Sequence, residues 1–309
     1  MENRVLVPPD VTESFIAHAA RLAQHMMRSC GDPAPGSGFV QVNDLYPFEK
    51  VSDRARHYVM AGLEHLVMWA DFAAPFKFHP EQTTTFTMRP TYALARAALE
   101  SAAQAVWLMD TRDPVECVQR HLRLIRWDLE EHRKSRLDPQ GKAQVNERDK
   151  KLIERVAQVF TKDQIRPPQG YLWVIQQACR PSDLDLDAAQ VERLWRAASG
   201  AAHGMYWTNL ELTEVEVGQE YEPGHFRTVT LPDPRAMLDV LQASEKMVTY
   251  AAFKYLLFSG EDPTRLMAGA RTWLAQEITL KPGADPNVRR RLAGEDPTRD
   301  ESLPDSSSR

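Results

Sequence analysis

The stretch RPTYALARAALESAAQAVWLMD, residues 89–110, is alanine-rich and has the spacing of a long helix. Its polar residues Arg89, Arg96, Glu100 and Gln104 fall on one side of that helix, amid an otherwise apolar surface. Charges held in such a surface need partners, and the four-residue spacing of Arg96 and Glu100 predicts an ion pair across one helical turn. The stretch therefore predicts a helix that is packed on most of its surface.

Helical periodicity continues through most of the chain and favours an all-α helical bundle. Asp-Pro pairs at residues 113, 233 and 262 indicate helix starts, because Asp caps a helix and Pro fits its first position. Helices are expected at residues 11–29, 52–74, 89–110, 114–136, 140–160, 170–179, 186–203, 234–258 and 263–277.

One segment departs from this pattern. In WTNLELTEVEVGQEYEPGHFRTVTLP, residues 207–232, apolar and polar residues alternate on both sides of Pro223-Gly224. This alternation predicts a small β-hairpin inserted at residues 208–231. A change of parity between Leu212 and Val215 indicates either a bulge there or a short irregular loop.

The expected organisation has three parts. Residues 1–80 form an N-terminal helical region, residues 81–279 form the main helical domain with the hairpin, and residues 280–309 form a tail. The tail contains almost no large apolar residues, so it is expected to be disordered.

Composition restricts the possible partners. The 309 residues include 38 Lys and Arg against 43 Asp and Glu, a net charge of -5, so any nucleic-acid contact must be local. Cys30, Cys117 and Cys179 show no disulfide or zinc pattern. Neither a leader segment nor a membrane span is recognisable, so a cytoplasmic protein without a membrane partner is expected.

The stretch WRAASGAAHGMYW, residues 195–207, holds the main candidates for chemistry. Arg196 and His203 are seven residues apart, which places them on nearly the same helical face, two turns from each other. Imidazole titrates near neutrality and guanidinium matches phosphate oxygens, so the pair suits phosphodiester chemistry. The alternative is a close-packed helix end, with Gly204 as its cap and His203 favoured by the helix dipole.

The spacing Arg196-x6-His203 resembles the R-x4-6-H motif of HEPN domains, a family of helical domains that includes prokaryotic toxins, abortive-infection proteins and ribonucleases. The alanine-rich helix at residues 89–110 is also similar to the helix that precedes the motif in uncharacterised bacterial HEPN-like proteins. The resemblance extends over about residues 89–206 and, at its widest, also over the helix predicted at 234–258.

This resemblance implies a homodimer that cuts RNA without metal or other cofactor, in a cleft shared by both chains. Arg196 would neutralise the phosphate, and His203 would act as acid or base while the ribose 2′-hydroxyl attacks. The products would carry a 2′,3′-cyclic phosphate and a 5′-hydroxyl. Active members usually have a polar residue directly after the motif arginine, where this chain has Ala197.

Supporting roles are expected for Arg96, Glu100 and Ser199. Besides pairing with each other, Arg96 and Glu100 would line the cleft of His203, where Arg96 adds phosphate affinity and Glu100 tunes the imidazole. These two interpretations are compatible.

The predicted helix at 114–136 is locally basic, so Arg123 and Arg126 join Arg89 as candidates for phosphate binding. The alternative for this helix is a solvated charged face.

No metal site is expected. His121, Asp128 and His132 share one side of this helix, but Ile125 lies between them. The predicted helices also lack the Glu-x-x-His pairs that a two-metal bundle would use. Gly-rich phosphate loops and nucleophile elbows are likewise not found.

These observations favour a metal-independent ribonuclease, or a related effector that binds RNA or a nucleotide in defence or stress control. An antitoxin or other inhibitor protein would then be an expected partner. The alternative is a non-catalytic helical interaction protein, in which Arg196 and His203 stabilise the helix end or a dimer seam.

Overall fold

Helices make up most of the computed structural model, which describes residues 4–7, 11–74, 84–280, 282–285 and 287–295. This confirms the predicted all-α fold with a small β-hairpin. The helices are α1 (Val11–Ser29), α2 (Gly38–Leu45), α3 (Val51–Ala73), α4 (Met88–Met109), α5 (Pro114–Ser135), α6 (Pro139–Val156), α7 (Tyr171–Ala178), α8 (Ala188–Ala202), α9 (Thr208–Glu211), α10 (Pro234–Phe258), α11 (Pro263–Glu277) and α12 (Val288–Ala293).

The predicted Asp-Pro helix starts are confirmed. The side chains of Asp113, Asp233 and Asp262 each accept a hydrogen bond from a backbone N–H of the first turn, at 2.8 to 2.9 Å. Because each cap is a local interaction, the sequence fixes where α5, α10 and α11 begin. The short helices α2, α9 and α12 were not predicted.

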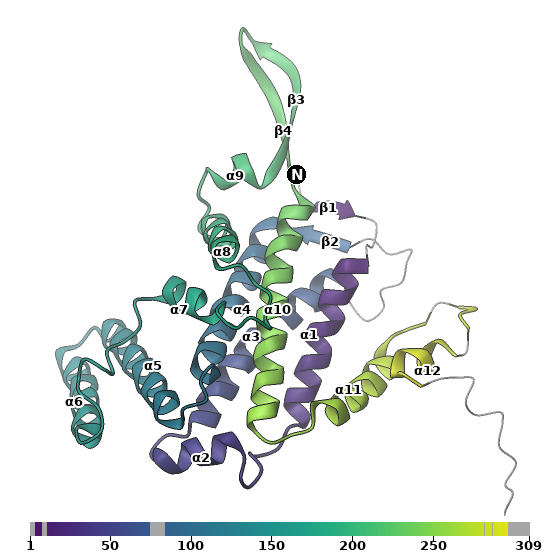
Figure 1. Cartoon of the computed structure of the whole chain (residues 1–309). Coiled ribbons are helices and arrows are strands. Elements are labelled where there is room, and N and C mark those ends of the chain that lie inside the picture. Colours follow the sequence, from purple (N-terminus) through teal and green to yellow (C-terminus); the bar gives the residue numbers. More distant parts are fainter. Residues whose placement is uncertain (1–3, 8–10, 75–83, 281, 286, 296–309) are drawn as a thin grey trace, which may run out of the picture.

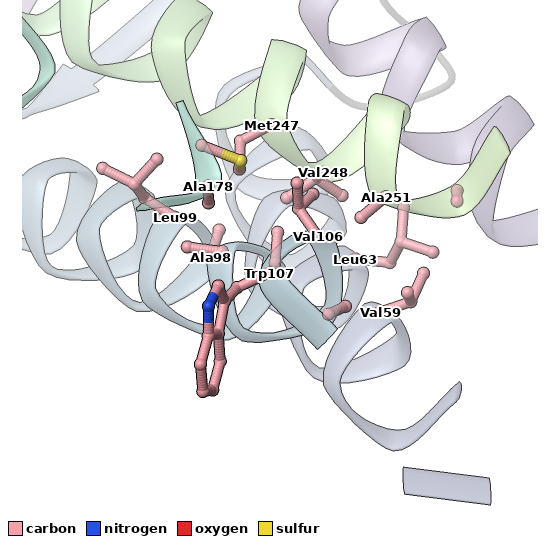
Figure 2. Close-up of a cluster of buried hydrophobic side chains, with 14 of the residues drawn as sticks. Val59, Leu63, Ala98, Leu99, Val106, Trp107, Ala178, Met247, Val248 and Ala251 are labelled. Atoms are coloured by element: carbon pink, nitrogen blue, oxygen red, sulfur yellow. The ribbon is translucent and has the colours of Figure 1, made fainter. Parts of the chain in front are cut away.

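Helices α3, α4 and α10 pack along one another at the centre of the molecule, and α1 lies against this group (Figure 1). Figure 2 shows side chains of all three central helices meeting, including Leu63, Leu99 and Val248. The second half of α4 is buried on all sides from Ala102 to Met109, which confirms the packed helix that its sequence predicts. The boundary expected near residue 80 does not separate two cores, because α1 and α3 share one hydrophobic cluster with α4 and α10.

Two small antiparallel sheets accompany the helices within the described residues. Strands β1 (Arg4–Val7) and β2 (Thr84–Thr87) form one, which was not predicted, and β3 (Thr213–Glu222) and β4 (His225–Pro232) form the predicted hairpin. Of the two explanations for the parity change after Leu212, the structure agrees with a short irregular connection, because Leu212 is the C-cap of α9 directly before β3. The register shifts of the hairpin occur further along, between Val217 and Glu222. The hairpin projects away from the helices (Figure 1).

The prediction of a disordered tail from residue 280 is wrong where the structure describes it. Helix α12 forms there and packs on α11, and the Arg289 guanidinium donates to the carbonyls of Gln276 and Ile278 at the end of α11. The hydrogen bonds of Arg289 thus join α12 to the end of α11. Residues 296–309 of this predicted tail lie outside the described residues. Among the described helices, none has both the length and the low polarity that crossing a bilayer requires.

His121 of α5 is completely buried, and its Nε2 donates to the Glu49 carbonyl at 3.0 Å. Burial, aided by the charge of Arg54, lowers the pKa of His121 to about 3. The nearby Asp128 carboxylate pairs with Arg54. In the described part of the chain, His121, Asp128 and His132 do not form a group that could hold a metal ion.

Acid is therefore expected to destabilise the protein through His121. Below pH 6.5, about the pKa of histidine in an unfolded chain, His121 binds a proton in the unfolded state but stays neutral in the native state. The free energy of unfolding therefore falls by up to about 1.4 kcal/mol for each pH unit. His121→Gln keeps a donor for Glu49 but does not titrate. Urea unfolding at pH 7.5 and 5 should show a smaller loss in this variant, and equal losses in both proteins would contradict the assignment.

Candidate functional site

Helix α8 carries the two residues of the motif and runs without interruption through Gly200. Asp187 caps its first turn, accepting from the Gln190 N–H at 2.7 Å. At its end, the Met205 N–H bonds to the Gly200 carbonyl and the Gly204 N–H to the Ala201 carbonyl, which is a Schellman motif with His203 as the C-cap. The expected glycine cap is thus confirmed, and the histidine lies at the helix end.

Gly204 adopts a left-handed backbone conformation, with φ of 69° and open space where a side chain would lie. Gly204→Ala is expected to destabilise the protein by about 1 kcal/mol through backbone strain alone. Gly269→Ala, in an equally open position inside α11 with ordinary helical geometry, should instead stabilise it slightly. Urea unfolding measures both, and the same sign for the two variants would contradict the cap.

Small residues let α8 lie close to its neighbours. Ala197, Ala198 and Ala201 are buried against the bundle. A β-carbon at Gly200 would lie 2.6 Å from Thr208 Cγ2 and 2.7 Å from Trp207 Cζ2, because the chain folds back over the helix at this point. The small residues between Arg196 and His203 therefore set the position of the segment that leads into the hairpin.

The His203 imidazole meets the polar side of α4. Arg96 Nη1 lies 3.2 Å from His203 Nε2, and Arg96 Nε donates to Glu100 Oε1 at 2.7 Å. Guanidinium has no acceptor, so this contact is a hydrogen bond only if Nε2 accepts it, which requires a neutral imidazole with its hydrogen on Nδ1. Both expectations for Arg96 agree with this geometry, because it pairs with Glu100 and also reaches His203.

Trp195, for which no role was predicted, completes the group. Its Nε1 donates to the same Glu100 oxygen at 2.7 Å, and the Arg96 guanidinium carbon lies 5.5 Å from the centroid of its ring. Glu100 thus holds two donors, one from its own helix and one from α8. Because the carboxylate is mostly buried, with 13% of its side chain exposed, this contact fixes α8 against α4.

Arg196 lies on the open side of α8. Its Nε and Nη2 both lie 2.8 Å from Glu192 Oε1, one turn earlier, and 57% of its side chain is exposed. The hydrogen bonds from Arg196 and Gln176 lower the pKa of Glu192. Within the described residues, no hydrogen bond or ion pair joins Arg196 to His203. Arg196 thus turns towards the start of α8, whereas His203 at its end contacts Arg96.

Within the described residues, no hydrogen bond joins the side chains of the other candidates on α4 and α8, Arg89 and Ser199, to this group. Arg89 is exposed in the first turn of α4, beside a surface groove. Ser199 is half-buried, and its carbonyl accepts from the His203 N–H.

Arg123 and Arg126 have structural contacts elsewhere. Arg126 is 9% exposed, bonds to Asp149 at 2.8 Å and also donates to the carbonyls of Lys162 and Ile165. Arg123 donates to the Arg166 carbonyl and lies 5.0 Å from the ring centroids of Trp107 and Trp173. These contacts give both guanidiniums a structural role, and phosphate binding by α5 stays a prediction.

A metal would need a group of at least three nearby ligands. In the part of the chain that the structure describes, His, Cys, Asp and Glu residues form no such group. All three cysteines are buried as free thiols, and burial raises the pKa of Cys117 to about 12 and that of Cys179 to about 11.

Comparison of the chain with protein-family models, with curated proteins and with solved structures finds no match. The arrangement of Arg96, Glu100, Trp195, Arg196 and His203 is therefore the basis on which function is inferred.

Proposed function

We propose that this protein binds single-stranded RNA at the face formed by α4 and α8 and cleaves it without a metal ion. The supporting observation is the 3.2 Å contact between the Arg96 guanidinium and His203 Nε2, with the exposed Arg196 two turns earlier on α8. A guanidinium beside an imidazole supplies phosphate binding and a proton acceptor in one place, and Arg196 adds a second cation once it turns from Glu192 towards the phosphate.

The chemistry follows from the groups present. A phosphate can accept hydrogen bonds from the Nη atoms of Arg96. Arg96 then no longer donates to His203 Nε2, and the lone pair of this nitrogen becomes free. That nitrogen accepts the proton of a ribose 2′-hydroxyl, whose oxygen attacks phosphorus while the bond to the 5′-oxygen breaks. The departing 5′-oxygen takes the proton back from the imidazolium, which leaves a 2′,3′-cyclic phosphate and a 5′-hydroxyl.

The position of Arg96 also affects whether the site needs a second chain. The resemblance to HEPN domains implies a cleft shared by two chains, whereas Arg96 gives His203 a second cation from its own chain. We therefore propose a site that one chain assembles, so the cleavage rate per chain should stay constant on dilution. A rate that falls with protein concentration would favour a shared cleft.

The test is cleavage of a defined single-stranded RNA in the presence of a chelator, with analysis of the fragment ends. The proposal expects full activity and cyclic phosphate ends. Loss of activity on chelation, fragments with a 5′-phosphate, or cleavage of a strand that lacks 2′-hydroxyls would each contradict it.

A second candidate is a non-catalytic helical interaction protein. It is favoured by the Schellman motif at His203 and by the Glu100 contacts, which give Arg96 and Trp195 a role in packing. In that case RNA would be neither bound nor cleaved, and substitutions at Arg96 would affect stability alone.

A further inference from the structure

The hairpin exposes an unusual number of apolar side chains for a surface element. Val215, Val217, Tyr221, Phe226 and Val229 are each about half exposed or more. Two strands alone are marginally stable in water, and this hairpin projects from the helices rather than lying on them (Figure 1). An apolar surface of this kind indicates a contact with another protein surface.

The hairpin is regularly paired between residues 213–217 and 228–232, and in this part the charged residues lie on one face. Residues directly opposite each other share a face, so β3 and β4 build a neutral face, which consists of Thr213, Val215, Val217, Thr228, Thr230 and Pro232. The opposite, charged face carries Glu214 and Glu216, beside Leu231 and Val229. Two neutral faces can therefore pack together without bringing the glutamates into contact.

The neutral face continues into a groove at the base of the hairpin. This groove has a volume of about 690 Å³ and is lined by Thr213, Thr230 and Pro232 on one side and by Met68, Phe72 and Leu94 of the helices on the other. Arg89 also lines it. At the far end of the hairpin, the tip carries the aromatic residues Tyr221 and Phe226 together with Glu220 and Glu222.

We infer that a second copy of this chain covers the neutral face. Two hairpins packed face to face and antiparallel would place the tip of each at the groove of the other. The aromatic residues of one tip then fill the apolar groove, and its glutamates approach Arg89, so shape and charge are both complementary. A two-fold axis satisfies both contacts at once, as an isologous dimer requires.

The size of the surface limits this arrangement. The neutral face spans five residues of β3, about 17 Å, so on both strands together it covers roughly 160 Å². Stable dimers bury about 800 Å² per partner. The face alone is too small, and the contact between tip and groove has to supply the rest.

Sedimentation of the full chain at micromolar concentration tests the inference. The wild type should be a dimer, and Val215→Lys on the neutral face should weaken it about tenfold or more, because the dimer would bury the new charge. Val229→Lys is the matched control, since Val229 is 51% exposed against 49% for Val215 but lies on the charged face. A monomeric wild type, or equal effects of the two substitutions, would overturn the inference.

Cysteine cross-linking gives a second measurement. Phe72→Cys with Phe226→Cys should form a disulfide between chains under oxidising conditions, with little background because the native cysteines are buried. Cross-linking no greater than in either single variant would contradict the contact between tip and groove. The inference does not rest on the proposed function, since a monomeric Val215→Lys that still cleaves RNA would separate the two.

Discussion

His203→Ala is expected to reduce RNA cleavage by about 100-fold or more, because it removes the group that exchanges protons with the 2′-hydroxyl and the leaving oxygen. The fold should survive, since His203 is exposed at the C-cap of α8 and the Schellman hydrogen bonds use backbone atoms. Initial rates on a single-stranded RNA, with circular dichroism to confirm helix content, measure the effect.

Ser199→Ala is the control for this substitution. Ser199 lies one turn before His203 on the same helix, and its backbone carbonyl, not its hydroxyl, accepts from the His203 N–H. The Ser199→Ala protein should cleave RNA at the wild-type rate. If His203→Ala cuts as fast as Ser199→Ala, His203 has no part in the chemistry and the non-catalytic alternative gains.

Arg126→Met is expected to lower the free energy of unfolding by about 2 to 4 kcal/mol, because it leaves buried carbonyls and Asp149 without their donor. Asp149 is 30% exposed, so water compensates for part of this loss. RNA binding by the folded variant should be unchanged, since Arg126 lies away from α8. Urea unfolding and RNA titration measure the two effects.

Lys134→Met on the same helix provides the comparison. Lys134 pairs with Glu130 and Glu131 in solvent, so its removal should change stability little. An Arg126→Met protein that is as stable as Lys134→Met but binds RNA less well would restore the phosphate-binding role that the sequence suggests for Arg126.

The long helices could be predicted within a few residues because their signals are local. Asp-Pro caps and apolar periodicity depend on residues close in the chain, and α5, α10 and α11 begin where Asp113, Asp233 and Asp262 place them. The pairing of β1 with β2 joins Val5 to Phe86, which no local pattern shows. Helix α12 forms through arginine contacts with α11, and composition alone suggested disorder there.

The contacts of the candidate site were likewise predictable only where the two residues lie close together in the chain. The spacing of Arg96 and Glu100 predicted their ion pair, and the same rule applied to Glu192 and Arg196 would have found the second pair. Trp195 was missed because its partner Glu100 lies 95 residues earlier. The sequence placed Arg96 and His203 in one candidate cleft, but their direct contact spans 107 residues and depends on how α8 packs on α4.

The most direct test of the central claim, that Arg96 and Arg196 bind phosphate around His203, is the affinity for a single strand without 2′-hydroxyls, which the site can bind but not cleave. At fixed salt, Arg96→Gln and Arg196→Gln should each weaken binding by about tenfold. Arg265→Gln is the matched control, because Arg265 is likewise exposed and paired with a glutamate one turn earlier. Equal affinities for all three variants would contradict the claim.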